Sequence, residues 1–246
     1  MAKSTLSGLY LVTGASSGIG LECARSIIKS GASVIAVHRS ESGLNKLKSS
    51  LNDSEKTRLI HEPKELLENV NTQKKWVLEL SKKYGRLAGG VLSAGVMDDV
   101  PVSAGDFIIK TKQIFQINLF STLALASGLC DRRVLDGDNK SIVAISSLAA
   151  YRSIIGTTAY TASKAALNAA FRVIAKEVAR LNIRVNTISP GFIKSPNKAG
   201  EITASDVAKL SIFLLSKEAI HISGADFMLS SKGCLKAKQK HNKFII

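Results

Sequence analysis

The sequence has no apolar run that reaches the ~18 residues needed to span a membrane, so no membrane association is expected. Residues 1–7 lack the apolar core of a secretion signal, which predicts a cytoplasmic protein. The three cysteines, Cys23, Cys130 and Cys234, are odd in number and far apart, and this favours reduced thiols over a disulfide framework or a metal site. No repeat, low-complexity linker or composition break divides the 246 residues, so we predict a single domain over 1–231.

Acidic residues are also scarce, because 34 Lys and Arg stand against 19 Asp and Glu, for a formal net charge of +15. A positive field can attract nucleic acid, acidic membranes or anionic substrates. Most lysines are scattered over predicted helices, however, which is typical of solvated faces. Residues 232–246 hold five lysines, no acidic residue and a single aromatic, Phe244. We interpret them as a flexible basic tail and expect no nucleic-acid partner.

Short apolar runs rich in β-formers alternate with helical patterns along the chain, and this predicts a parallel sheet covered on both faces. The expected fold is a Rossmann-type, doubly wound α/β fold with a mainly parallel seven-stranded sheet. Strands are predicted at 9–13, 33–38, 58–61, 87–93, 141–146, 184–188 and 226–229. Helices are predicted at 18–30, 41–51, 64–84, 105–130, 158–181 and 203–216.

A glycine-rich segment, 13–20, follows the first predicted strand and opens the first predicted helix. Small residues at Gly14, Gly18 and Gly20 let the backbone approach a dinucleotide closely. The helix N-terminus adds free N–H groups and a favourable dipole for the pyrophosphate. The competing interpretation, a helix-opening turn with chance glycines, is less consistent with the residues downstream.

Tyr160 and Lys164 lie four residues apart, with Ser147 thirteen residues before Tyr160. This spacing places the phenol and the ammonium on one helix face. A nearby positive charge favours the phenolate, so we predict a lowered pKa for Tyr160, as proton transfer near neutral pH requires.

With the glycine loop before them, these residues make the chain resemble the short-chain dehydrogenase/reductase family in its single-domain form. The resemblance implies an NAD(P)(H)-dependent oxidoreductase that interconverts a carbonyl and a secondary alcohol. Tyr160 would exchange a proton with the substrate oxygen, and Ser147 would hydrogen-bond that oxygen. Lys164 would hold the nicotinamide ribose, and Asn118 would position a water that relays protons to it. The alternative is a cofactor-binding relative with an interaction or regulatory role and little turnover.

The resemblance also implies a set of cofactor contacts. At the end of the second strand Arg39 stands where users of NAD often have a carboxylate, and a guanidinium can pair with a 2′-phosphate. NADP(H) is therefore favoured, with NAD(H) possible. The implied contacts are Gly14, Ser16, Ser17, Gly18, Ile19, Gly20, Arg39, Ser93, Ala94, Gly95, Tyr160, Lys164, Pro190, Gly191, Ile193 and Ser195.

Four segments depart from the family pattern. Leu92-Ser93-Ala94-Gly95 replaces the usual Asn-Asn-Ala-Gly, and the acidic residue expected after the third strand has no clear counterpart at 61–63. The segment from 192 to 203 is short for a substrate lid, and 229–233 lacks the usual acidic-glycine turn. These departures leave the substrate undetermined.

The helices around 119–126 and 165–171 are apolar or small nearly all round. Such helices are usually buried on every side. Because the corresponding helices commonly pair between subunits in the family, we predict a homodimer or homotetramer; the alternative is burial within the monomer.

Overall fold

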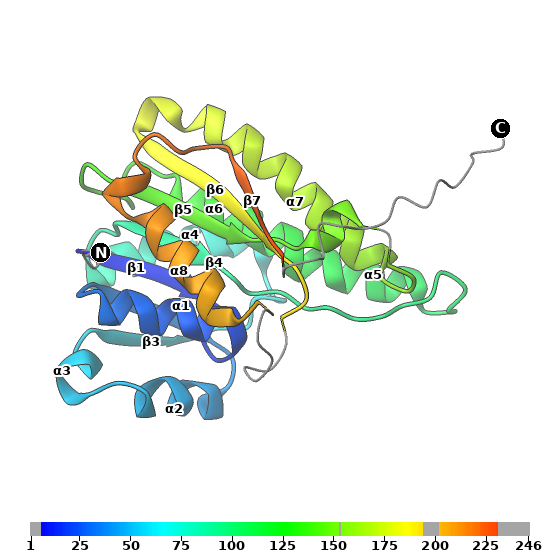
Figure 1. Ribbon diagram of the computed structural model, residues 1–246, viewed down its shortest axis with the longest axis horizontal. Helices are drawn as coiled ribbons and strands as arrows, with labels where there is room; N and C mark the ends of the chain where they lie inside the picture. Colours follow the sequence, from blue (N-terminus) through cyan, green and yellow to red (C-terminus); the bar gives the residue numbers. More distant parts are fainter. Residues whose placement is uncertain (1–5, 153, 194–201, 231–246) are drawn as a thin grey trace.

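The computed structural model describes residues 6–152, 154–193 and 202–230. They form one seven-stranded sheet in the order β3-β2-β1-β4-β5-β6-β7, and every pairing is parallel (Figure 1). The strands are β1 (Leu9–Thr13), β2 (Ser33–His38), β3 (Leu59–Pro63), β4 (Gly89–Leu92), β5 (Lys140–Ile145), β6 (Ile183–Pro190) and β7 (Asp226–Leu229). This is the Rossmann-type, doubly wound fold predicted from the sequence.

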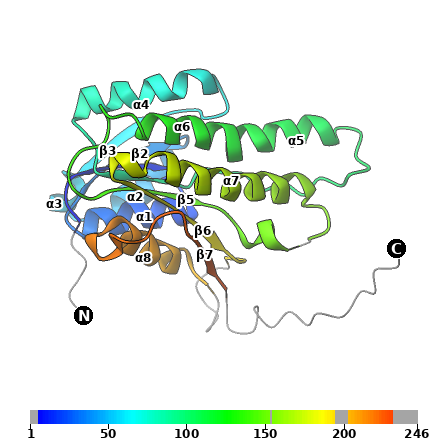
Figure 2. The same ribbon diagram turned by 90° about the horizontal axis from the view of Figure 1, so that it is seen from above.

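Helices cover both faces of the sheet, as Figure 2 shows from above: α4 to α7 lie on one face, and α1, α2 and α8 on the other. The α-helices are α1 (Gly18–Lys29), α2 (Glu41–Ser49), α3 (Asp53–Lys56), α4 (Val70–Tyr84), α5 (Phe107–Phe115), α6 (Thr122–Leu129), α7 (Thr158–Glu177) and α8 (Ala204–Leu215). A π-helix, η1 (Gln116–Ser121), joins α5 to α6, and short 3-10 helices follow at η2 (Leu148–Tyr151), η3 (Ala179–Leu181) and η4 (Lys217–Ala219). None of the described helices has the length and apolar character of a membrane span.

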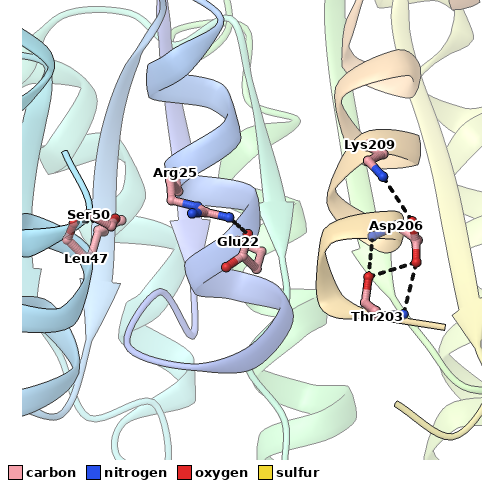
Figure 3. Close-up of polar contacts among 7 residues, drawn as sticks. All are labelled: Glu22, Arg25, Leu47, Ser50, Thr203, Asp206 and Lys209. Carbon is pink, nitrogen blue, oxygen red and sulfur yellow. Dashed lines mark hydrogen bonds and ion pairs between the residues drawn. The ribbon is translucent and has the colours of Figure 1, made fainter. Parts of the chain in front are cut away.

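The apolar core has two main parts, one on each face of the sheet. On the face covered by α1, α2 and α8, α1 packs beside α8, and the Cys23 thiol donates to Ser211 Oγ at 3.6 Å. A capping box starts α8, since Thr203 Oγ1 accepts from the Asp206 amide at 3.3 Å and the Asp206 carboxylate accepts from the Thr203 amide at 3.1 Å (Figure 3). This box fixes the first turn of the helix that covers β4 to β6.

The cysteines within the described residues are free thiols. Burial raises the pKa of Cys23 to about 12 and that of Cys130 to about 11, so both stay protonated at neutral pH. Cys234 lies outside the described residues, as do the predicted tail and Ser195.

All seven predicted strands are present, but two predicted helices were wrong in detail. The helix expected from residue 64 begins only at Val70, because Asn69 adopts a left-handed conformation (φ 49°) and the chain from 64 to 69 leaves β3 as a loop. The helix expected over 105–130 changes to π-helical hydrogen bonding at Gln116–Ser121. A π-segment shifts the following side chains around the axis and is frequent at functional sites.

The strand order reverses between β1 and β4, because the chain crosses from β3, at one edge, back to the far side of β1. Loops that follow strands on either side of such a point diverge and leave a crevice at the carboxyl ends. Figure 1 shows the strands pointing toward the side of the molecule on which α5 projects. The predicted site residues come from segments at this end.

Candidate functional site

The glycine loop packs directly against the loop that follows β4. Thr13 Oγ1 accepts hydrogen bonds from the backbone amides of Ser93 and Ala94 at 3.0 and 3.1 Å. A side chain at Gly14, where φ is +66°, would lie 3.1 Å from the Ala94 backbone, and one at Gly20 only 2.3 Å from the Gly14 carbonyl oxygen. Only glycine fits in this turn, so the bare backbone of both loops faces the crevice.

The amino end of α1 is open to an anion. Its N-cap residue, Ser17, makes no side-chain capping bond, and the first turn contains no acidic residue. The N–H groups of a helix start therefore keep their capacity to bind phosphate oxygens. Ile19 anchors this turn by packing against the core, while Gly43 of α2 leaves room for Ser16, whose backbone oxygen would lie 2.3 Å from a side chain there.

A cavity of about 140 Å³ lies beside the glycine loop at the carboxyl end of β2. Arg39 lies on its wall, two-thirds exposed, with Nη1 3.7 Å from Glu65 Oε2. His38 is buried there, and neither ring nitrogen has a hydrogen-bond partner. The cavity is lined by Gly14, Ser16, Ser17, Val37, His38, Arg39, Lys64, Glu65, Leu66, Ala94, Gly95, Val96 and Ile117.

Sequence reasoning missed His38 and the segment 64–66 as parts of this cavity. An acidic residue does follow the third strand there, but it is Glu65 rather than a residue at 61–63. Glu62 instead accepts hydrogen bonds from Tyr84 and Lys83 of α4. No local signal marked residues 64–69 as a loop, because a proline at 63 is compatible with a helix that starts just after it.

Lys164 is buried on α7, and its Nζ donates to the Ile145 carbonyl oxygen at the end of β5 at 2.9 Å. Burial lowers the pKa of this ammonium to about 8. Nζ lies 5.9 Å from the ring centroid of Tyr160. An ammonium has three donors, so the bond to Ile145 leaves two for a ligand in the crevice.

Tyr160 behaves differently from the sequence prediction. Burial raises the pKa of its phenol above the usual range, and a hydrogen bond with Ser147 lowers it by less. The predicted lowering by Lys164 was therefore wrong in direction, because desolvation disfavours the phenolate more than its neighbours favour it. The protonated phenol prevails at neutral pH.

The two consecutive serines after β5 have different partners. Ser147 lies close enough to Tyr160 to lower the pKa of its phenol, and its Oγ accepts from the Ala149 amide at 3.1 Å as the cap of η2. Ser146 is buried and donates to the Lys164 carbonyl oxygen at 3.3 Å. The structure thus brings together Ser147, Tyr160 and Lys164. Ser146 instead contacts the backbone of α7.

Asn118 is fully buried in η1, where its amide holds the loop after β4. Oδ1 accepts from the Val96 amide at 2.8 Å, while Nδ2 donates to the Val96 carbonyl at 2.9 Å and to Ser163 Oγ at 3.1 Å. Both amide N–H groups are engaged, and a side chain at Gly95 would lie 3.1 Å from Oδ1 and 3.4 Å from Lys164 Nζ. The amide therefore fastens the β4 loop to α7.

The turn after β6 packs against η2 beside the candidate site. Pro190 ends the strand, and the Gly191 amide donates to the Leu229 carbonyl oxygen at 2.8 Å. A side chain at Gly191 would lie 3.3 Å from Leu148 of η2, and Ile193 packs against the core. Among the described residues no group of three His, Cys, Asp or Glu side chains could hold a metal ion.

The chain matches the family model described as short chain dehydrogenase over residues 9–205. It is 35% identical to L-xylulose reductase of Caenorhabditis elegans, over 74% of this chain and 70% of that protein. It is 31% identical to the 3-oxoacyl-(acyl-carrier-protein) reductase FabG of Thermotoga maritima, over 87% and 92% of the two chains. A crystal structure of a short chain dehydrogenase from Escherichia coli CFT073, complexed with NADPH, superposes with a TM-score of 0.81 at 27% identity, over 93% of this chain and 99% of that one.

Replacing Gly20 with alanine should weaken NADPH binding, because the new methyl group would meet the Gly14 carbonyl at 2.3 Å and force the loop open. Overpacking costs about 1–3 kcal/mol, so we expect a roughly ten- to hundred-fold higher Kd by fluorescence titration. Gly105→Ala is the control, since no atom lies within 4 Å of its added carbon. An unchanged Kd in Gly20→Ala would contradict the close approach of the loop.

Proposed function

Because the chain belongs to the short-chain dehydrogenase family, whose members are NAD(P)-dependent oxidoreductases, we propose that it interconverts a carbonyl and a secondary alcohol by hydride transfer. The observation that carries the proposal is the meeting of Ser147, Tyr160 and Lys164 beside the glycine loop. A bound nicotinamide supplies or accepts the hydride. The protein's own groups handle the proton and the charge on oxygen.

In this proposal Tyr160 donates its proton to the substrate oxygen during reduction, and Ser147 stabilises the charge that develops there. The phenol of Tyr160 is protonated at neutral pH and so holds the proton that it gives, while its raised pKa makes it a weaker acid than a pKa nearer neutral would. Lys164, with two N–H donors left over, binds the hydroxyls of the nicotinamide ribose. Asn118 fixes the adjoining loop through its amide; the water relay to Lys164 stays a prediction.

Tyr160→Phe removes only the phenolic oxygen, so the ring still packs and Lys164 keeps its place. Positioned acid catalysis contributes ~10²–10⁴-fold, and we expect kcat to fall at least a hundred-fold with little change in NADPH affinity. Lys164→Ala should instead harm both, because the ammonium also binds the cofactor. Near-normal turnover by Tyr160→Phe would show that another group is the acid.

The alternative is a cofactor-binding family member that acts by interaction and turns over little substrate. Incubation with NADPH and a panel of ketones and aldehydes, followed at the nicotinamide absorbance, separates the two. Met97, Ile154 and Phe192 expose 58%, 51% and 76% of their surface in the loops after β4, β5 and β6. The panel should therefore include carbonyls with large apolar groups. Cofactor binding without turnover across the panel would favour the alternative.

NADP(H) is the proposed cofactor, with NAD(H) as the other possibility. The position of Arg39 on the cavity wall supports binding of the 2′-phosphate of NADP(H). Solved structures of similar proteins complexed with NADPH or NADP support this class of cofactor. Glu65 opposes it in part, because its carboxylate lies 3.7 Å from the same guanidinium. The cofactor contacts proposed from the sequence fall on the glycine loop, Arg39, residues 93–95, the Tyr160–Lys164 pair and the turn from Pro190.

Arg39→Ala should weaken NADPH selectively, because NADH has no 2′-phosphate for the guanidinium. A charge-assisted hydrogen bond is worth roughly 1.5–3 kcal/mol, so the loss is about ten- to a hundred-fold in Kd. Arg133→Ala, which removes an exposed arginine bonded to Asp131, is the matched control. Equal losses for NADPH and NADH in Arg39→Ala would refute this role.

We also propose that the protein is a homodimer or homotetramer that pairs through the layer of α5, η1 and α7. Ile108, Ile109, Phe120 and Val173 expose 59%, 63%, 48% and 55% of their surface there. Exposed apolar patches of this kind favour burial against another chain. Light scattering should give a dimer or tetramer at micromolar concentration, and Val173→Lys should shift it toward monomer. A monomeric wild type would overturn the proposal.

A further inference from the structure

One carboxylate, that of Asp226 at the start of β7, accepts hydrogen bonds from three separate segments. Tyr151 Oη donates to Oδ2 at 2.6 Å. Ser189 Oγ lies 2.8 and 2.9 Å from the two carboxylate oxygens, and Thr187 Oγ1 donates to Oδ1 at 2.7 Å. Asn168 Nδ2 donates to Oδ2 at 3.3 Å. Hydrogen bonds to a charged acceptor are stronger than those between neutral groups, so the Asp226 carboxylate holds these segments firmly together.

Each of the three segments carries a group of the candidate site. Tyr151 is the last residue of η2, the turn that Ser147 caps. Asn168 follows Lys164 by one helical turn of α7, and Ser189 directly precedes Pro190 and Gly191. The carboxylate therefore ties together the supports of the serine, the lysine and the turn after β6.

The bond to Tyr151 is the one whose donor lies in the turn that Ser147 caps. The Tyr151 side chain is half exposed, and besides donating to Asp226 its hydroxyl accepts from Asn168 Nδ2 at 3.2 Å. Burial and the Asp226 carboxylate both raise the pKa of Tyr151, so it remains a donor at neutral pH. Ser147 Oγ accepts from the Ala149 amide, so the serine hydroxyl and Tyr151 belong to one hydrogen-bonded turn.

We propose that Asp226 is a positioning residue, which through Tyr151 fixes the η2 turn and so presents Ser147 to Tyr160. This inference rests on the proposed carbonyl chemistry. Asp226 does not act on the substrate; it sets the place of a hydroxyl that does. A misplacement of about 1 Å in such a group can cost ~10²-fold in rate.

The test is a double-mutant cycle between Tyr151→Phe and Ser147→Ala, measured as kcat. Tyr151→Phe should lower kcat about ten- to a hundred-fold with the Kd of NADPH unchanged. In the Ser147→Ala background the same change should have little further effect, because coupled residues are not additive. A full additional loss in that background would show that Tyr151 does not act through the serine. Asp226→Asn, which also weakens the bonds from Thr187, Ser189 and Asn168, should lower kcat at least as much as Tyr151→Phe does.

Tyr84→Phe is the matched control, since Tyr84 also donates to a carboxylate, Glu62 of β3, at the opposite edge of the sheet from β7. It should leave kcat unchanged. Normal kcat in Tyr151→Phe would overturn the proposal even if both variants lose similar stability.

Hydrogen–deuterium exchange tests the positioning without turnover. The amides of residues 148–152 should exchange roughly ten-fold faster in Tyr151→Phe and Asp226→Asn than in wild type or Tyr84→Phe, because local opening sets this rate. If the wild type reduced no carbonyl, the proposed function would fail on its own. Unchanged exchange of this segment would then overturn the positioning role independently.

Discussion

The structure depends on the close backbone contact between the carboxyl ends of β1 and β4. Thr13 bonds to two amides of the β4 loop, and neither Gly14 nor Gly20 has room for a side chain. This contact joins the two halves of the sheet at the point where strand order reverses. The crevice, the open start of α1 and the cavity beside β2 all follow from it.

Burial determines the protonation of the paired residues on α7. Desolvation lowers the pKa of Lys164 to about 8 and raises that of Tyr160. In each case it favours the uncharged form. The phenol therefore stays protonated at neutral pH, and burial outweighs the effect that sequence spacing alone predicted for Lys164.

Strands and the glycine loop could be predicted because their signals are local: short apolar runs, and glycines after a strand. The loop at 64–69 and the π-helix at Gln116–Ser121 could not. Residues 64–84 carry a helical pattern throughout, and asparagine at 69 permits the left-handed conformation that precedes α4 without requiring it. Because residue 65 was expected inside a helix, Glu65 was not predicted to line the cavity.

The sequence by itself determined the family, the parallel sheet and the identity of Ser147, Tyr160 and Lys164 as candidates, because spacing along one helix and the order of motifs are properties of the chain. Only the tertiary structure decided how those groups are held. The pKa of Tyr160, the partners of Asn118 and the convergence of three segments on Asp226 depend on burial and on contacts between residues far apart in sequence. Such contacts leave no periodic signal, since each joins elements that only the folded sheet brings side by side.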